Sequence, residues 1–334
     1  MALTFNELQA ITNDYFIMDG RKAIDIYFQD SFLMYKFMDK KAGLMERPSG
    51  GKTYRIPLEY DGQEGGFYSR GETLSSDSKE IMNAAFFYPK HAYGNATIYR
   101  SDEQENAGDY AEVQLVTQHI AGAQKTCRKN IAKNLYGNNT DADKNITGLV
   151  KCCFGSTSIA YGSIIETDLV ASEATAPTGG TLYPWHAVNT TTTEAIGLAV
   201  IRTLRSSAKI GDGANGKPNV GVTTEALFNI VSGVLQVQQR FTEDKDTVKA
   251  GFTNLVFEGM TLAADDYVPS GYLFVLNSKH YGWAIHRNGF FERTPWGDLS
   301  NAPSGVAGKT MKIFWDGNQV VSNRRAHAGH SNLS

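Results

Sequence analysis

The sequence has 334 residues, a formal net charge of −3 and a hydrophobic fraction of 41%. A single hydrophobic core stops growing at roughly 250 to 300 residues, so we expect two lobes or one lobe with long excursions. The nearly balanced charge, without any basic block, excludes a protein that grips nucleic acid tightly through its phosphates. Contact with DNA is expected to be weak and nonspecific.

The cysteines and the chain start indicate the compartment. Cys127, Cys152 and Cys153 form no spaced disulfide framework, so we expect reduced thiols that serve as small apolar residues. The first residues lack the basic start and apolar run of a signal peptide, and no segment reaches the roughly 18 apolar residues of a membrane helix. We expect a chain that is neither exported nor inserted in a membrane.

The N-terminal region predicts two short helices. Residues 4–7 have capping-box spacing ahead of an apolar run, and residues 21–38 follow with a high density of aromatic side chains and methionine. This second segment has more apolar surface than so small a region can bury alone, so we expect it to pack on the main body or on another subunit. Its apolar residues include Ile24, Phe28, Phe32 and Tyr35.

Two strand-like stretches predict an arm. Residues 54–60 alternate like a strand, and Pro57 places that strand at a sheet edge. A polar, glycine-rich stretch separates them from residues 81–100, which are aromatic and β-branched. The simplest structure is a long two-stranded arm with a flexible tip. Because an isolated hairpin is only marginally stable in water, the arm has to lie on another surface. An ordinary hairpin packed on its own domain remains the alternative.

Residues 106–137 predict one long amphipathic helix. Acidic residues at its start and basic residues at its end complement the helix dipole, and Gly137 provides the stop. About 28 residues would make a rod of roughly 42 Å, which suits a scaffold. A long helix of an α/β enzyme is the alternative. Apolar or small residues recur in steps of three and four at Val113, Val116, Ile120, Ala123, Cys127, Ile131 and Leu135.

The second half of the chain predicts helices and then strands. Residues 148–170 read as short strands and turns. Thr191 and Glu194 repeat the capping-box spacing before a helix with Ile196, Val200 and Leu204 on one face, and another helix covers residues 224–239.

Strands follow at residues 254–266 and 271–277. The last alternating region, residues 311–323, reads as two strands joined by a hairpin turn at Asp316, Gly317 and Asn318. The tail from Arg324 onward is predicted to be unstructured.

No motif indicates an active site. Residues 211–218 fit G-x-G-x-x-G, but Pro218 stands where a phosphate loop needs Ser or Thr, and no buried strand leads into it. Asp265 and Asp266 flank a turn, and the paired histidines of the tail, His327 and His330, have no supporting ligands. We therefore expect no enzyme, no cofactor and no metal, and a structural role.

Taken together, the segments resemble the major capsid proteins of tailed bacteriophages, which have the HK ninety-seven type fold. The resemblance covers nearly the whole chain. It lies in the order and extent of the segments, and none of them is a catalytic signature. It includes ALTFNELQAIT, AIDIYFQDSFLMYKF, GGKTYRIPLEYDGQEGGFYSRGETL, AAFFYPKHAYGNATI, YGSI with Trp185 downstream, KPNVGVTTEALFNIVSGVLQVQQRF, AGFTNLVFEGMTLAADDYVPSGYLFVLN and MKIFWDGNQVVSNRRAHAG.

The resemblance implies an α+β fold in four parts. These are an N-terminal arm (1–50), an extended β-hairpin loop (51–104), a peripheral domain with the long spine helix (105–185 and 309–334) and an axial domain (186–308). The arm and the loop tip would contact neighbouring subunits. The residues implied for these interfaces are Ile24, Phe28, Phe32, Tyr35, Gly65, Gly66, Phe67 and Arg70.

The resemblance also implies a function. Pentamers and hexamers would close into an icosahedral shell around double-stranded DNA, in a virion assembled in the host cytoplasm. Because the resemblance starts within a few residues of Met1, we expect a separate scaffolding protein, besides a portal and decoration proteins. The tip, residues 61–78, contains no lysine, so we expect noncovalent subunit contacts. The alternatives are an encapsulin-like nanocompartment shell and a soluble α/β enzyme that binds nucleotide through residues 211–217.

Overall fold

The computed structural model describes residues 31–39, 43–63, 65–74, 77–105, 115–155, 160–170, 183–211, 216–236, 254–300 and 305–334. These residues form two compact units. The larger unit comprises Asp30–His91, Ile131–Asn288 and Asp316–Ser334, and the described residues of the smaller unit fall in Ala92–Asn130 and Gly289–Trp315. Three elements have residues in both units: β4 (Lys90–Tyr99), α3 (Leu115–Leu135) and β13 (Gly308–Val321).

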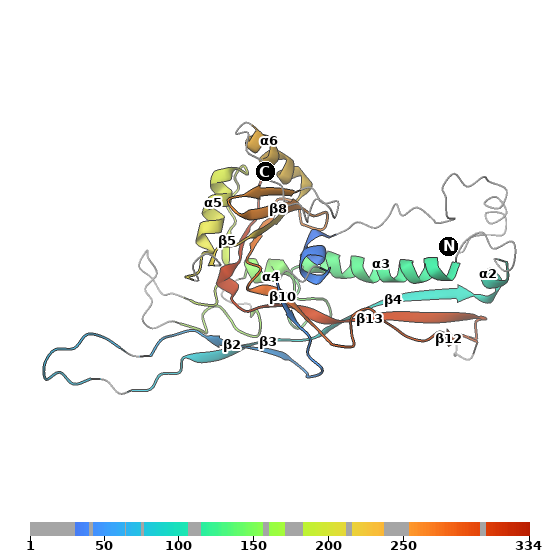
Figure 1. Cartoon of the computed structure of the whole chain (residues 1–334), viewed down its shortest axis with the longest axis horizontal. Helices are drawn as coiled ribbons and strands as arrows, with labels where there is room; N and C mark the ends of the chain where they lie inside the picture. The colour runs from blue at the N-terminus through green and yellow to red at the C-terminus, as the bar shows by residue number, and fades with distance from the viewer. Residues whose placement is uncertain are drawn as a thin grey trace. The chain divides into compact units, whose positions relative to one another are not determined.

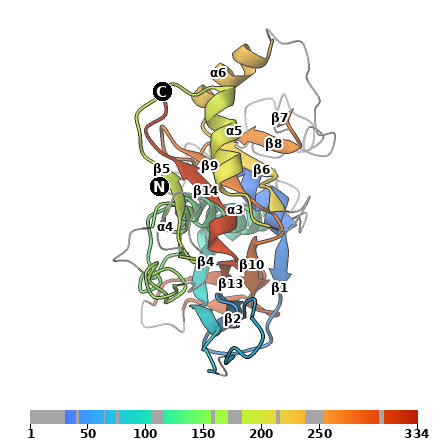
Figure 2. The ribbon, with the colours of Figure 1, turned by 90° about the vertical axis from the view of Figure 1, so that its left-hand side faces the viewer.

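The larger unit contains a six-stranded sheet with the order β5-β14-β9-β6-β8-β7. The strands are β5 (Val188–Thr190), β6 (Val220–Thr223), β7 (Asn254–Phe257), β8 (Met260–Ala264), β9 (Leu273–Leu276) and β14 (Ala328–His330). Helices α5 (Leu198–Ser207) and α6 (Glu225–Gln236) share a hydrophobic core with this sheet (Figure 2). Buried residues three or four positions apart, such as Ile201 and Leu204 on α5, give each helix its inward face.

Helix α5 does not begin with the predicted capping box. Gly197, in an extended conformation, occupies the N-cap position without a side-chain bond. The prediction for Thr191 and Glu194 is wrong because β5 ends only one residue before Thr191, and Glu194 bridges to Leu333. The carboxylate of Glu194 is engaged elsewhere, with Oε1 at 2.6 Å from His330 Nε2.

The C-terminal segment is folded, so the prediction of an unstructured tail is wrong. Residues Arg324–Ala326 form the 3-10 helix η4, and β14 lies between β5 and β9 in the sheet. The side chains of Arg324, His327 and His330 are buried. The segment looked solvated because its residues are polar, but those side chains find partners inside the fold. The last strand therefore belongs to a sheet formed otherwise by residues 188–276.

Residues 308–321 form one strand, so the predicted hairpin turn at Asp316, Gly317 and Asn318 is wrong. Gly317 pairs with Ile285 and Asn318 with Ala284, in the antiparallel ladder of β13 with β10 (Tyr281–Ile285). The Asn318 side chain donates to the carbonyl oxygen of Tyr88 (2.9 Å) and to Thr147 Oγ1 (3.0 Å). Asparagine is common in turns, but Asn318 makes buried hydrogen bonds here instead. On the other side of β10 lies the short parallel strand β1 (Leu44–Glu46).

The predicted arm is shorter than expected. Strands β2 (Tyr54–Glu59) and β3 (Met82–Phe87) form a two-stranded sheet, in which Pro57 faces Ala84. The chain then leaves the hairpin, and β4 pairs with β13 instead. Lys90 fixes this break, because its buried ammonium donates to the carbonyl oxygens of Asp141 and Asp143, and burial lowers its pKa. The expected single strand over residues 81–100 is therefore wrong.

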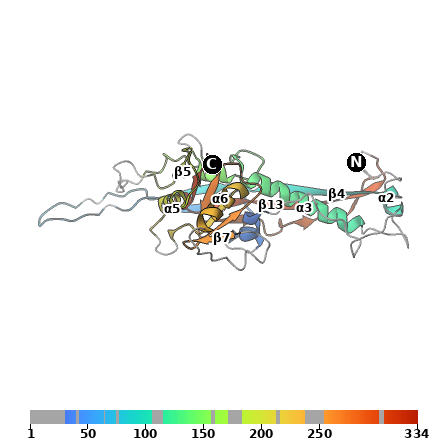
Figure 3. The same cartoon turned by 90° about the horizontal axis from the view of Figure 1, so that it is seen from above.

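In the smaller unit, α3 runs alongside β4 and β13 (Figures 1 and 3). Ala96, Ala123, Met311 and Ile313 form the buried cluster between them. A Cβ at Gly94 would collide with the carbonyl oxygen of Ala123, so this close approach of strand and helix requires glycine. Strands β11 (Glu292–Arg293) and β12 (Gly297–Asp298) extend the sheet on β13, and the short helix α2 (Arg100–Glu105) follows β4.

The long helix is confirmed over residues 115–135. Its 21 described residues give a rod of roughly 30 Å. Residues 106–114, with Val113, lie outside the described part. Cys127, Ile131 and Leu135 are buried as predicted, whereas Val116 is 42% exposed and does not continue the buried stripe.

Candidate assembly surfaces

The loop between β2 and β3 is exposed along most of its described residues. The amide of Tyr60 donates to the carbonyl oxygen of Ile81 at 3.0 Å and closes the hairpin. Beyond that bond the chain forms no strand over the described residues 61–63, 65–74 and 77–81, and Figure 1 shows it leaving the hairpin. Phe67 is 107% exposed and Tyr68 is 70% exposed. A Cβ at Gly65 or Gly66 would meet no atom within 4 Å from the described residues beyond its chain neighbours.

A tight turn shapes the end of this loop. The amide of Glu72 donates to the carbonyl oxygen of Ser69 at 3.1 Å, and the amide of Ser69 donates to Glu72 Oε2 at 2.7 Å. Gly71 has φ +87°, as the third residue of a type II turn requires. The exposed Arg70 is the second residue of this turn and therefore stands at its apex. We call residues 65–70 the loop tip.

The N-terminal interface residues divide into two groups. Ile24 and Phe28 lie outside the described residues. Phe32 is completely buried in the larger unit, and Tyr35 is half-buried. The expectation that Phe32 faces another subunit is therefore corrected, because its own chain already covers it.

Asp265 holds this N-terminal segment in place. Its Oδ2 accepts hydrogen bonds from Ser31 Oγ (2.7 Å) and Tyr136 Oη (2.8 Å), and its Oδ1 accepts from the amide of Tyr267 (3.1 Å). Burial raises the pKa of Asp265, and burial together with the nearby carboxylate raises the pKa of Tyr136 well above its usual value. The carboxylate joins three segments that are distant in sequence, so its role here is structural.

Arg324 is the second buried anchor. Its guanidinium donates to the carbonyl oxygens of Cys152 (2.9 Å) and Lys151 (3.0 Å), which end the short helix α4 (Leu149–Cys153). These carbonyls would otherwise be unsatisfied at the helix end. Helix α4 replaces the strands predicted for this region. Glu166 neutralises the guanidinium, and its Oε1 also accepts from the amide of Ala187 at 2.7 Å.

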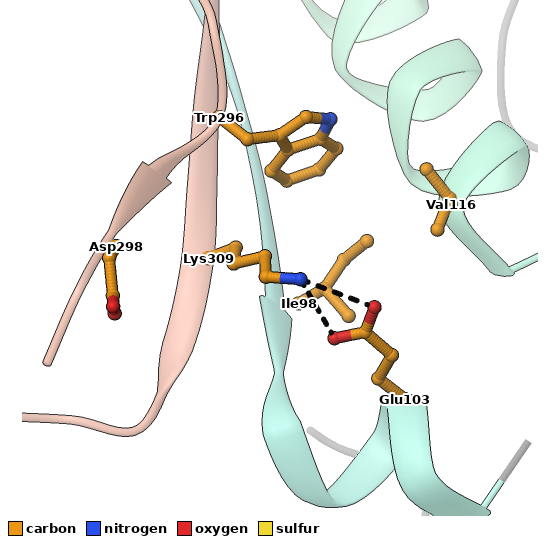
Figure 4. Close-up of a pocket in the computed structure, with 6 residues that line it drawn as sticks. All are labelled: Ile98, Glu103, Val116, Trp296, Asp298 and Lys309. Atoms are coloured by element: carbon orange, nitrogen blue, oxygen red, sulfur yellow. Dashed lines mark hydrogen bonds and ion pairs between the residues drawn. The ribbon is translucent and has the colours of Figure 1, made fainter. Parts of the chain in front are cut away.

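The smaller unit has an open pocket of about 370 Å³ (Figure 4). Ile98 from β4, Val116 from α3 and Trp296 form its apolar part. Its charged rim consists of Glu103, Asp298 and Lys309, and Lys309 Nζ lies 3.4 Å from Glu103 Oε2. Asp298 Oδ1 accepts from Ser300, which lowers the pKa of the carboxyl group. This pocket could not be predicted from the sequence, because its residues come from five separate segments.

Helix α6 exposes an apolar face in the larger unit. Ile230 is 44% exposed and Val234 is 39% exposed, and Ala226 and Gly233 share that face. The face has no charged side chain beyond the first residue, Glu225.

The glycine-rich loop offers no nucleotide site in the described residues. Helix α5 leads toward it, and residues 212–215 lie outside the described part. The amide of Ile210 donates to the carbonyl oxygen of Gly216 at 2.9 Å and closes the loop on itself. Within the described ranges, no three His, Cys, Asp or Glu side chains gather as metal ligands. The same ranges contain no helix long and apolar enough to span a membrane.

Comparison with known proteins identifies the fold. No protein-family model matches the sequence, and no curated protein matches it significantly. The capsid of cyanophage A-1(L) matches with a TM-score of 0.65 and 12% identity, over 95% of this chain and 97% of that chain. Mycobacterium phage Adephagia matches with a TM-score of 0.57 and 11% identity, over 100% of this chain and 99% of that chain. An encapsulin complex from Synechococcus elongatus PCC 7942 matches with a TM-score of 0.56 and 8% identity, over 100% of this chain and 97% of that chain.

These matches cover at least 95% of each chain. The chain therefore has the α+β HK ninety-seven type capsid fold, and the fold class predicted from the sequence is confirmed. Phage capsids and an encapsulin share that fold, so the fold alone does not choose between their functions.

Proposed function

We propose that this chain is the major capsid protein of a tailed bacteriophage. Copies of it form pentamers and hexamers, and these close into an icosahedral shell around double-stranded DNA. The proposal rests on the fold shared with two phage capsids, and on surfaces that the chain does not cover itself. The protein would reside in the virion after assembly in the host cytoplasm.

The loop tip is the observation that carries this proposal. A phenylalanine exposed to 107% has no packing partner that would stabilise its position in an isolated subunit. An apolar side chain that stays in water contributes no free energy of burial. Burial of Phe67 against a neighbouring subunit would contribute roughly 1.5 to 3 kcal/mol to the free energy of association. The loop tip and the apolar face of α6 are therefore expected to be buried in the assembled shell.

The four parts implied by the sequence resemblance follow as part of the proposal. Residues 1–50 would be the arm, residues 51–104 the extended loop, and residues 105–185 with β13 the peripheral domain. The axial domain, residues 186–308, would also include the C-terminal segment, because β14 pairs with β5 and β9. Of the arm residues, Ile24 and Phe28 stay candidates for intersubunit contact.

The charge of the chain fits its proposed contents. A net charge of −3 on 334 residues gives a surface that neither binds nor strongly repels DNA phosphates. DNA would be contacted nonspecifically. A separate scaffolding protein, a portal and decoration proteins are the further partners of such a shell.

Electron microscopy of the expressed protein, alone and with candidate scaffolding proteins, tests the assembly. The encapsulin match makes a nanocompartment shell the second candidate. Purified particles separate the two, because a capsid protects DNA from nuclease and a nanocompartment contains a protein cargo. A small monomer that binds nucleotide tightly would favour the α/β enzyme instead.

A further inference from the structure

Another pocket lies at the base of the hairpin formed by β2 and β3. It has a volume of about 480 Å³, and all of its lining residues belong to the larger unit. Strand β2 and residues 47–53 form its sides, and one face of the sheet made by β1, β10 and β13 forms its floor. The volume falls within the range of small-molecule sites in proteins.

The floor of this pocket is apolar and hollow. Paired residues of a sheet direct their side chains to the same face, so Leu44, Gly282 and Val320 form one row across the three strands. Ala284 belongs to the next row. Gly282 has no side chain, and a Cβ there would collide with the carbonyl oxygen of Leu44. The sides add three further apolar residues, Pro48, Ile56 and Pro57. The interior is therefore suited to a hydrocarbon group.

The rim of the pocket is positively charged overall. It contains the guanidinium groups of Arg47 and Arg55 and one carboxylate, that of Glu46, which leaves a surplus of one positive charge. The Arg55 guanidinium lies 5.4 Å from the centroid of the Phe86 ring, its cross-strand neighbour in β3. A guanidinium that lies over a ring can still donate hydrogen bonds from its edge. The rim is therefore suited to a single anionic group.

We propose that this pocket binds an apolar monocarboxylate of the medium-chain fatty acid type. The hydrocarbon chain fills the hollow over Ala284 and Val320, and the carboxylate accepts hydrogen bonds from Arg55, with Arg47 as the second cation. A carboxylate matches a guanidinium because two parallel N–H···O bonds can form between the two planar groups. The site needs only one copy of the chain and goes beyond the proposed shell function.

The bound chain would connect the hairpin to the sheet. Strand β2 pairs with β3 and with no other described strand, so its base is free of the larger sheets. A hydrocarbon in the pocket contacts Ile56 and Pro57 on one side and the floor on the other. Because such a ligand binds only the folded arrangement, it stabilises that arrangement. Hydrogen exchange of the β2 amides is therefore expected to slow when the ligand is added.

Calorimetric titration of purified full-length subunits tests the chemistry of the site. The probe is decanoate, used below its micelle concentration, and we expect saturable binding of one molecule per chain. Acetate has the same anionic group without the hydrocarbon, and decyltrimethylammonium has the hydrocarbon with the opposite charge. Each of these two should bind at least about tenfold more weakly than decanoate.

Arginine variants test the anionic end of the site. Arg55→Gln removes the charge from an exposed position and should weaken decanoate binding by about tenfold or more, and Arg47→Gln should also weaken it. Arg293→Gln is the matched control, because Arg293 is an exposed arginine of the smaller unit and should leave the affinity unchanged. Circular dichroism confirms that each variant is folded.

Photo-labelling locates the hydrocarbon end. A decanoate analogue with a diazirine near the end of its chain should label peptides that contain residues 44–57, Ala284 or Val320, and excess decanoate should prevent the labelling. Labelling that is spread over other exposed apolar residues would overturn the site.

Two further results would also overturn it. These are equal affinity for decanoate and decyltrimethylammonium, and wild-type affinity in Arg55→Gln. None of the measurements requires particles, so failure of the pocket leaves the shell function standing. Failure to form particles would leave the pocket standing in turn.

Discussion

Arg324 Nη1 lies 3.1 Å from Glu166 Oε1 inside the larger unit, and the Arg324 side chain has no exposed surface. Its partners come from α4 and from the segment before β5, whereas Arg324 itself lies in the C-terminal segment. This single cation therefore connects parts of the chain that are more than a hundred residues apart.

Removal of that cation is expected to destabilise the fold strongly. Arg324→Met leaves Glu166 buried without its counter-charge and should reduce the free energy of unfolding by about 3 to 5 kcal/mol. Denaturant unfolding of the subunit measures this. Arg202→Met is the control, because its ion pair with Glu258 is exposed and should contribute no more than about 1 kcal/mol. Equal losses in both variants would contradict the anchoring role.

Deletion of residues 326–334 is expected to prevent folding. The deletion removes β14 from between β5 and β9, so β5 loses its only strand partner and one edge of β9 is left unpaired. Soluble expression and far-ultraviolet circular dichroism provide the measurement. His330→Gln, which keeps the strand backbone, should still give soluble protein. A deletion variant that remains soluble with wild-type dichroism would refute the observed place of β14.

Stability at acidic pH should depend on His327. Burial lowers the pKa of His327 to about 3, and its Nδ1 accepts a hydrogen bond from the amide of Asn277. Below pH 6.5 the unfolded chain therefore binds a proton that the folded chain does not. The resulting stability is complete above that pH and declines by about 1.4 kcal/mol per unit as the pH falls toward 3.

Unfolding as a function of pH, compared between wild type and His327→Gln, measures this contribution. The variant should have a flatter profile between pH 6.5 and 3. His91→Gln is the control, since the side chain of His91 is 73% exposed. A wild-type slope retained in His327→Gln would assign the acid sensitivity to other groups, such as the neighbouring His280.

The long helix is expected to tolerate loss of side-chain volume but not of backbone continuity. Ile120→Pro lies within α3, removes a helical hydrogen bond and should cost about 3 kcal/mol or more, with loss of assembly. Ile120→Ala keeps the helix and should still assemble. Particle counts by electron microscopy distinguish the two, and closed particles from Ile120→Pro would show that α3 is not the scaffold of its unit.

Subunits in mature particles are expected to be joined without covalent bonds. The stretch from residue 61 to 78 contains no lysine that could form an isopeptide crosslink. Denaturing electrophoresis of purified particles should therefore give one band at 36.6 kDa. A ladder of multiples would disprove this.

Periodic patterns predicted the elements that pack by an apolar face. The stripe at Ala123, Cys127 and Ile131 placed α3, and Leu227 with Val231 placed α6, because buried faces leave a regular signal in the sequence. The alternation of apolar and polar residues predicted β2. The edge position of Pro57 followed from its missing amide hydrogen. The resemblance across the chain supplied the order of the parts.

Polar residues that are satisfied inside the fold could not be predicted in this way. Asp316, Gly317 and Asn318 have the composition of a turn, but the buried partners of Asn318 lie 171 and 230 residues away. Arg324 and His330 looked like a solvated tail for the same reason. The pocket at Trp296 was also missed, since five chain segments meet there only after folding.

The chain is expected to complete its surface only in a many-copy shell. Electron microscopy of particles assembled from the full chain, with nuclease treatment before the DNA content is measured, tests it most directly. We predict closed icosahedral particles that retain protected double-stranded DNA when they are isolated from producing cells. A stable monomer that remains monomeric at high concentration and with every candidate scaffolding protein would contradict the claim.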